Sequence, residues 1–507
     1  MGRKPKLRAQ AREVDGDSRI GRTIFMQISR QISGHCAGLT PRHISTHASK
    51  QSIRRSGPAK SRRRETDGFI ITLVAIFLLF VVGAMAALSI DVVTFYTARS
   101  EAQLAADSGA LAGARVLANS GATSDSSGNT FTAAQLIAGA VATQVAESNS
   151  VGGQPLLAGN ISVSFNGNNG SPCPQAQQVS NPCVTVQITT TVPVFFARIW
   201  GNTQVTISAS ATAEAYNPSG LATGASSSQN IPIAPSCVKP WLLPNIDPTS
   251  SAGNPTPIFN KTFGTIENSA LLGWETPNPR GSIRFYARCD GNGNCNGSTG
   301  TAAAWQYFVG DNSSFPQPTQ SVPSCTLTTP FQESIAGCVQ TPIACGTTSS
   351  GSVPSSQVNI DFVDDSSLNT QAAEAVNCLA HLSGGKGDTI SSTMMPPTPF
   401  EFTAGDDNPL VQAGSLTSEK ETMVSDSLVT VPVFDSTGTP SSPVTVIGFV
   451  QLFLQPNGKA VSGFTTPQYG IRTKIINLVG CGTNSTGTPP VYGNGATAVP
   501  VRLISPP

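Results

Sequence analysis

An uncharged apolar run from Phe69 to Ile90 is the feature that most constrains what this chain can become. The run holds 22 residues without a charged side chain and is bounded by Asp67 and Asp91. As a helix it would be about 33 Å long, which is enough for a hydrocarbon core of roughly 30 Å. The competing explanation is a buried helix of a soluble protein, but such helices rarely carry about 18 or more consecutive apolar residues. We therefore predict a single transmembrane helix.

The charges on the two sides of this run predict its orientation. Up to Arg64 the chain has 16 Lys and Arg residues against three acidic ones, and from Gly68 onward it has 14 against 24. Basic flanks stay in the cytoplasm, so the N-terminus is expected inside and the rest of the chain outside. A basic tail can also bind nucleic acid. Beside a membrane span its orienting role is a sufficient explanation, and we expect no nucleic-acid partner.

The helical pattern continues past Asp91. Ala, Leu, Arg, Glu and Gln predominate, and only Gly109 and Gly113 interrupt them, so we predict a stalk that continues to about Leu117. Small residues recur every four positions in two lines: Ala102, Ala106, Ala110 and Ala114 in one, and Ala105, Gly109 and Gly113 in the other. Such faces let another backbone approach closely. Two interpretations are open, packing against partner helices of an envelope assembly and packing against the chain's own domain.

The stretch after the apolar run also carries a resemblance to a known family. The run ends in Asp91, and an aromatic pair, an arginine and the string Leu-Ala-Ala-Asp-Ser-Gly-Ala-Leu-Ala-Gly-Ala follow. This pattern resembles the N-terminal segment of Flp-pilus-assembly proteins of the TadG type, from the bacterial tight-adherence (Tad) system. About 50 of the 507 residues match closely. The matching positions are Asp91, Phe95, Tyr96, Arg99, Leu104 to Asp107, and Ala110 to Ala114.

The resemblance implies a membrane-anchored component of Tad/Flp pilus assembly in the bacterial inner membrane, with its C-terminal domain periplasmic or extracellular. It implies action by binding other assembly proteins or pilins, without catalysis and without a cofactor. The stalk would mediate homo- or hetero-oligomer contacts. The residues expected to pack there are Asp91, Tyr96, Ala102, Leu104, Ala106, Asp107, Ala110 and Gly113.

Alternatives to an assembly component are a minor pilin, a surface adhesin and, less favoured, an envelope hydrolase, and a signal peptide is an alternative explanation of the N-terminus. A minor pilin would be processed after Gly68, but Leu73 stands where such processing favours Glu. A secretory signal peptide could be cleaved after Ala84-Met85-Ala86, although the apolar run is longer than a usual signal core. A surface adhesin anchored by the same helix fits the polar composition of the remainder, of which only a small share is charged.

The expected fold class is a single-pass membrane-anchored α+β protein with five regions. Residues 1–67 form a disordered basic tail, 68–118 the transmembrane helix and stalk, 130–216 a small α+β domain, 217–230 a linker, and 231–507 a large, mainly β, disulfide-bonded domain. In the α+β domain, a helix near 131–149 would present Leu136, Ile137, Val141 and Val145 on one face.

Strands are expected after this helix and near the end of the chain. Val184, Val186 and Ile188 alternate with polar residues and predict a half-buried strand that pairs with the strand containing Ile207. The run 444–455 is apolar on both faces and is the predicted central strand of the β domain. A helix is predicted around Ala373 to Ala380.

Ten of the eleven cysteines follow the apolar run, which suggests up to five disulfides outside the cytoplasm. Short loops make Cys173 with Cys183 and Cys289 with Cys295 the obvious pairs, and the remaining connectivity is open.

The small number of histidines after the apolar run limits the catalytic sites that this part of the chain could form. Only His381 lies beyond the apolar run, so an envelope hydrolase would have to be built on that residue. The Asp290 to Thr301 stretch begins like a calcium loop but lacks its Gly and Glu positions, and we expect no metal site.

Overall fold

The computed structural model describes most of the chain after Thr66. The described residues are 66–125, 129–166, 173, 181–201, 203–219, 231–247, 256–267, 269–272, 283–287, 304–318, 325–346, 356–361, 367–382, 386–390, 401–422, 424–435, 441–461, 471–481, 490–493 and 497–504. Nearly all of the predicted disordered tail, most of the predicted linker, and the Cys289–Cys295 pair lie outside them, while the last two residues of the predicted tail belong to a helix. The chain divides into two units, Met1–Val92 and Val93–Pro507.

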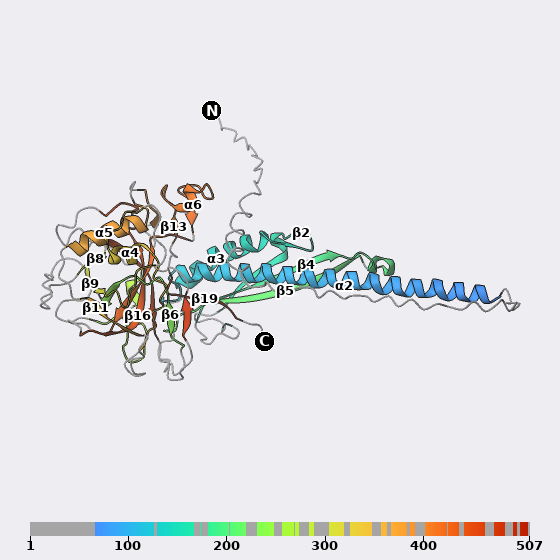
Figure 1. The fold of residues 1–507 in the computed structure, drawn as a ribbon, viewed down its shortest axis with the longest axis horizontal. Helices are drawn as coiled ribbons and strands as arrows, with labels where there is room; N and C mark the ends of the chain where they lie inside the picture. Colours follow the sequence, from blue (N-terminus) through green and yellow to red (C-terminus); the bar gives the residue numbers. More distant parts are fainter. Residues whose placement is uncertain are drawn as a thin grey trace, which may run out of the picture. The chain divides into compact units, whose positions relative to one another are not determined.

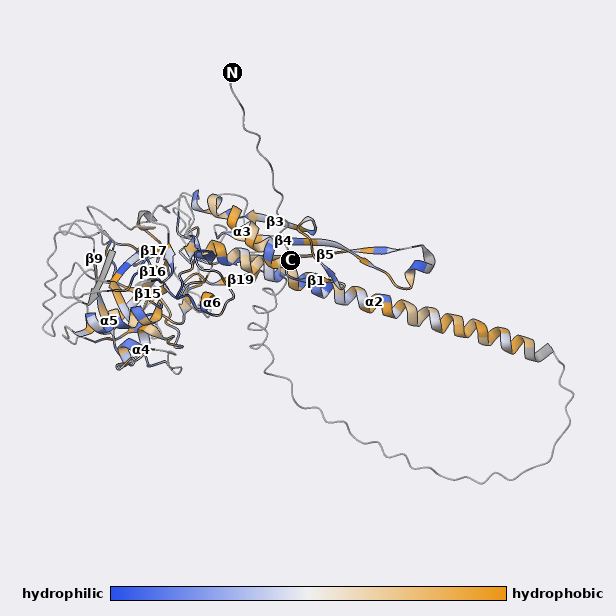
Figure 2. Cartoon of the chain, turned by 90° about the horizontal axis from the view of Figure 1, so that it is seen from above, coloured by the Kyte–Doolittle hydropathy of each residue, from blue (hydrophilic) through white to orange (hydrophobic). Residues whose placement is uncertain are grey.

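The predicted long helix is confirmed. Helix α2, Thr66–Asn119, is continuous over 54 residues, so the chain does not leave the helical conformation at Asp91. It is long and apolar enough to cross a membrane, and in its most apolar part the side chains are exposed rather than covered by protein. Figure 2 shows that the hydrophobic residues of α2 are concentrated in its first half.

In the second unit, the C-terminal part of α2 packs with helix α3 on one side of an antiparallel sheet (Figure 1). The order of this sheet is β19-β5-β4-β3. The elements are α3 (Asn129–Glu147), β3 (Ile161–Asn166), β4 (Cys183–Pro193), β5 (Gln204–Ala215) and β19 (Val501–Ile504). Short elements lie between them: β1 (Ser150–Val151), β2 (Gln154–Pro155), η1 (Ala158–Asn160) and η2 (Ala197–Trp200).

The alternation in β4 is confirmed. Val184, Val186 and Ile188 are buried, while Gln187 and Thr189 between and beyond them are exposed. The strand pairs with β5 from Cys183↔Glu214 to Pro193↔Gln204, an unbroken antiparallel hairpin. The apolar segment between the two strands is the loop at the tip of this hairpin.

The predicted apolar face of α3 is confirmed only in part. Ile137 and Val141 are half-buried against the core, but Leu136 is 82% exposed, and the centre of the buried face is made mostly of alanines. The buried residues of α3 are Thr130, Phe131, Ala134, Ala138, Ala142 and Ala146. The reason is the short distance between α3 and the small-residue face of α2, where only methyl groups fit and larger side chains are displaced to the flanks.

The remainder of the second unit is built on a closed β barrel. Strands follow each other in the order β16-β15-β7-β9-β8-β17, and β17 pairs again with β16 to close the ring. Their bounds are β7 (Trp241–Pro244), β8 (Ile283–Ala287), β9 (Ala304–Gly310), β15 (Leu428–Phe434), β16 (Val444–Leu454) and β17 (Ile471–Gly480). The predicted central strand is confirmed as β16, in which every residue but Thr445 is buried.

Helices and short strands surround this barrel. The helix predicted around Ala373 is confirmed as α5, which packs with the unpredicted α4. The bounds are η3 (Ser269–Leu271), α4 (Pro330–Ala336), α5 (Ser367–Leu379) and α6 (Pro409–Gln412). The short strands are β6 (Ile233–Pro235), β10 (Gln357–Val358), β11 (Ile360–Asp361), β12 (Thr389–Ile390), β13 (Phe402–Thr403), β14 (Glu421–Thr422) and β18 (Val491–Gly493).

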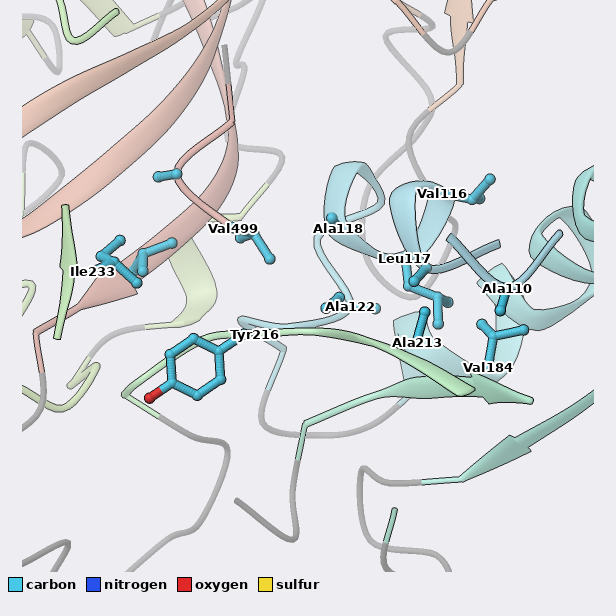
Figure 3. Close-up of a cluster of buried hydrophobic side chains, with 14 of the residues drawn as sticks. Ala110, Val116, Leu117, Ala118, Ala122, Val184, Ala213, Tyr216, Ile233 and Val499 are labelled. Atoms are coloured by element: carbon cyan, nitrogen blue, oxygen red, sulfur yellow. The ribbon is translucent and has the colours of Figure 1, made fainter. Parts of the chain in front are cut away.

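One hydrophobic core joins the stalk region to the barrel region. It contains Ala110 and Val184 together with Phe449 and Val479 of the barrel. Figure 3 shows Ala110, Leu117 and Val184 beside Ala213 of β5, with Tyr216, Ile233 and Val499 farther along the same cluster. The regions predicted as 130–216 and 231–507 therefore share a core, and β19 from the end of the chain lies in the sheet of the first.

Four disulfides are described. The predicted Cys173–Cys183 bridge is confirmed, with its cysteines ten residues apart. The other three connect distant segments: Cys237–Cys338, Cys325–Cys378 and Cys345–Cys481.

Candidate interaction surface on the stalk helix

Both lines of small residues in α2 are covered by the chain's own domain. Ala102, Ala106 and Ala110 have no exposed surface. A Cβ on Gly109 would lie 2.9 Å from the carbonyl oxygen of Ala142, and one on Gly113 would lie 3.1 Å from Cγ1 of Val184. These distances leave no room for a larger side chain. Of the two interpretations of these lines, the structure shows packing against α3 and β4.

The opposite face of the stalk is exposed. Tyr96 is 72% exposed and Leu104 is 53% exposed, and both lie on the stripe formed by Val93, Tyr96, Thr97, Ser100 and Leu104. These positions follow a spacing of three or four residues, so they share one side of the helix. We call these five residues the stalk ridge. It combines a tyrosine, a leucine and a valine with small polar residues and lacks a charged side chain.

Polar contacts hold the stalk in place beside the ridge. Gln103 donates from Nε2 to Oδ1 of Asp107 at 2.8 Å and to the carbonyl oxygen of Ser210 at 3.1 Å. Glu101 accepts from the backbone nitrogen of Gly152 at 2.7 Å. Asp107 therefore orients Gln103 toward the chain's own sheet.

The predicted site residues thus separate into two groups. Tyr96 and Leu104 are exposed and can meet another molecule. Five others lie in the interior or support it: Ala102, Ala106, Asp107, Ala110 and Gly113. Asp91 is also buried, and it shares its helical face with Ala98 and Ala102.

Comparison with known proteins identifies the same part of the chain. Residues 68–116 match the Tad family model, whose members are Flp pilus-assembly TadE/G-like. This match agrees with the resemblance seen in the sequence and supports a role in the pilus system. No curated protein and no solved structure matches the chain. We refer to residues 68–116 below as the Tad segment.

The Tad segment ends where α2 meets the barrel, and a buried polar network joins the two. Asn477 of β17 donates from Nδ2 to the carbonyl oxygen of Ala118 at 2.6 Å. Ser124 exchanges hydrogen bonds with the backbone of Leu478, donating at 2.8 Å and accepting at 3.0 Å. Asn217 donates to the carbonyl oxygens of Thr123 and Leu478 at 3.0 and 2.9 Å. These bonds attach the end of the stalk directly to a barrel strand.

Sequence reasoning missed this network. One signal was present, because Asn477 interrupts the otherwise apolar end of β17 and a polar residue in a buried strand needs a partner. The partners that β17 meets in this network, Ala118, Ser124 and Asn217, are more than 250 residues away from it in the chain and leave no local pattern.

The residues that raised the question of catalysis or metal binding lie far from the stalk in sequence. His381 Nε2 lies 3.0 Å from Oδ2 of Asp426, and this hydrogen bond is the main cause of a raised His381 pKa. Within the described ranges, no three His, Cys, Asp or Glu side chains are grouped to hold a metal ion. The calcium-like stretch 290–301 lies outside those ranges.

Proposed function

We propose that this protein is a membrane-anchored component of Tad/Flp pilus assembly that acts by binding other proteins of the cell envelope. The observation that carries the proposal is the Tad segment, because the family match covers the apolar run and the stalk together. The match supports a role in the pilus system, and the anchoring and the mode of action are our extension of it.

Anchoring in the bacterial inner membrane is supported by α2 itself. Its apolar side chains from Phe69 to Ile90 are exposed, and burying them in lipid would stabilise the protein by roughly 25 cal/mol for each Å² of apolar surface. The basic residues before the run favour a cytoplasmic N-terminus. The second unit would then lie in the periplasm or outside the cell, where its disulfides are stable.

Binding through the stalk ridge is supported by the contrast between the two sides of the stalk. One side is fixed to the chain's own sheet, so the ridge is held in a defined orientation on a rigid support. Tyr96 and Leu104 supply apolar contact area of the kind that anchors protein interfaces. The proposed partners are other assembly proteins, pilins or a second copy of this chain.

The ridge offers a sharper test than the buried alanines. Replacing Ala106 or Ala110 by Leu would disturb the chain's own core, so a loss of pili would not distinguish folding from binding. Leu104→Asp changes an exposed residue of the stalk ridge instead, so the core of the protein is left intact. The matched control is Leu136→Asp, which makes the same change at an exposed position of α3 outside the ridge.

The experiment complements a deletion strain with each variant, shears the cells, and measures pili in the sheared fraction and the intact mass of the protein in the membrane fraction. We expect pili to be lost in the deletion strain and in Leu104→Asp, and normal in Leu136→Asp, with full-length protein in the membrane throughout. Normal piliation in the deletion strain would refute the function. A chain shortened near Gly68 in the sheared fibres would instead identify a minor pilin.

A further inference from the structure

Apolar and basic side chains gather at the tip of the β4–β5 hairpin. Between Pro193 and Gln204 the tip carries Phe195, which is 63% exposed, Phe196, which is 37% exposed, and an exposed Arg198. The outward positions along the body of the two strands are polar instead, as at Gln187, Thr189, Thr206 and Ser208. The aromatic surface is therefore confined to the end of the hairpin.

Contacts inside the second unit define where this tip lies along the stalk. Val184, at the start of β4, lies against Gly113. Val192, near the end of β4, lies against Gly152, and the nitrogen of Gly152 donates to Glu101. Strand β4 therefore runs antiparallel to α2, from the level of residue 113 to the level of residue 101.

Phe195 and Phe196 of the tip follow Val192 by three and four residues, in the direction in which β4 runs along α2. An extended chain covers about 3.3 Å per residue and a helix about 1.5 Å, so three or four fully extended residues would correspond to about seven to nine helical residues. Strand β4 ends at Pro193 and Phe196 has αR backbone angles, so Phe195 and Phe196 reach at most this far before the level of Glu101. The tip therefore lies beside the part of α2 between roughly Val93 and Glu101. The exposed Tyr96 and Arg99 belong to the same part of α2. In the sequence, Val93 follows Ile90, the end of the apolar run, by three residues.

We propose that the hairpin tip rests in the lipid headgroup layer of the membrane that α2 crosses, so that the second unit has a second membrane contact. We define the interfacial band as Tyr96, Arg99, Phe195, Phe196 and Arg198. Aromatic rings are favoured at this depth, and arginines there meet anionic phosphates. The inference rests on the anchoring in the proposed function, and it adds that the hairpin restricts tilt and rotation of the second unit about the stalk.

The test places the photoreactive analogue p-benzoylphenylalanine at one position at a time in the full chain, reconstituted in vesicles of phosphatidylethanolamine and phosphatidylglycerol. The test position is Phe195, where an aromatic ring replaces an aromatic ring on an exposed loop. Leu136 on α3 is the matched exposed control, and Phe77 within the apolar run reports the anchoring itself. Adducts are identified by mass spectrometry after irradiation.

We expect lipid adducts at Phe77 and at Phe195, both several-fold above Leu136. Lipid adducts at Phe77 with Phe195 no higher than Leu136 would overturn the inference and leave the anchoring intact. Adducts to protein in place of lipid at Phe195 would overturn it as well. If Phe77 gives no lipid adducts, the anchoring is refuted. The inference about the hairpin tip is then refuted as well, because it depends on the anchoring.

Discussion

Gly109 shows at the scale of single residues why the stalk face is built from small side chains. A Cβ at this position would lie 2.9 Å from the carbonyl oxygen of Ala142 and 3.2 Å from the Cβ of Ala146. The obstacle is backbone, which cannot rotate away as a side chain can. The recurring alanines and glycines of α2 are therefore explained by the close approach of α3.

This explanation predicts opposite effects for the same substitution in two helices. The higher helix propensity of alanine would stabilise Gly109→Ala by about 1 kcal/mol. The added Cβ would clash with the backbone of α3, which would lower the free energy of unfolding by about 1–3 kcal/mol. Gly139→Ala in α3 makes the same gain, and its Cβ would be 3.6 Å from the ring of Phe165, an ordinary contact. We expect thermal unfolding, followed by circular dichroism in detergent, to occur at a lower temperature in Gly109→Ala than in Gly139→Ala. Equal unfolding temperatures would contradict the packing argument.

Lys239 is a buried lysine whose protonation makes the stability of the folded protein depend on pH. Burial lowers its pKa to about 7 from 10.5, although the charge of Asp426 acts in the opposite direction. Its Nζ donates to the carbonyl oxygen of Gly337 at 2.7 Å. Because the folded pKa is below the unfolded one, the unfolded chain binds more protons between these two values. Stability therefore rises with pH across this window and is lost as pH falls toward 7.

Replacing Lys239 by Met removes this dependence. Between about pH 7.5 and 9, we expect the stability of the wild type relative to Lys239→Met to rise by up to about 1.4 kcal/mol for each pH unit. Lys386→Met is the control, because the hydrogen bond with Asp406 raises the Lys386 pKa and so moves its titration above this window. The measurement is the unfolding temperature of all three proteins at both pH values. A wild-type advantage over Lys239→Met that does not change with pH would refute the prediction.

At the scale of elements, β19 completes the sheet that supports the stalk. It pairs with β5 from Val501↔Ala215 to Ile504↔Thr212. Arg502 forms an ion pair with Glu214, whose side chain has no exposed surface, and its guanidinium lies 4.6 Å from the ring centre of Tyr216. Burial is the main cause of a raised Glu214 pKa, and the charge of Arg502 opposes it.

A double-mutant cycle tests how β19 is held. Arg502→Met leaves the carboxylate of Glu214 buried without its cation, and we expect a loss of about 3 kcal/mol in unfolding free energy. Adding Glu214→Gln removes the buried charge and should restore a large part of that loss. The comparison uses denaturant unfolding of the two single variants and the double variant. Additive losses in the double variant would show that the two side chains act independently.

At the scale of the whole molecule, two kinds of connection bind distant parts of the second unit together. The polar network around Asn477 attaches the end of α2 to β17. The Cys345–Cys481 disulfide, whose cysteines are 136 residues apart, attaches another segment near the end of that same strand. A displacement of the stalk would therefore be carried directly to the barrel.

The long disulfide is expected to contribute more stability than the short one. In the chain-entropy account, closing the loop between Cys345 and Cys481 is worth roughly 2 kcal/mol more than closing the ten-residue loop between Cys173 and Cys183. Each pair is replaced by two serines, and denaturant midpoints are compared in detergent under non-reducing conditions. An equal or smaller effect at the long pair would show that local strain or residual structure outweighs loop entropy.

Several parts of this structure could be predicted from the sequence because they depend on local patterns. The length of α2 follows from an uninterrupted apolar run joined to good helix formers. The alternation in β4, the two-sided apolar character of β16 and the short Cys173–Cys183 loop are local in the same sense. Tyr96 and Leu104 were recognised by resemblance, although the resemblance did not separate them from the buried alanines beside them.

The sequence by itself therefore determined the long helix, the strand patterns and the small-residue lines of the stalk, since each depends on neighbours in the chain. Only the tertiary structure decided what covers those lines, which side of α3 is buried, that the barrel closes through β16 and β17, and that β19 joins the first sheet. These outcomes depend on contacts between residues tens to hundreds of positions apart. Alanine on α3 is buried in place of Leu136 because close backbone approach outweighs the larger apolar area of leucine.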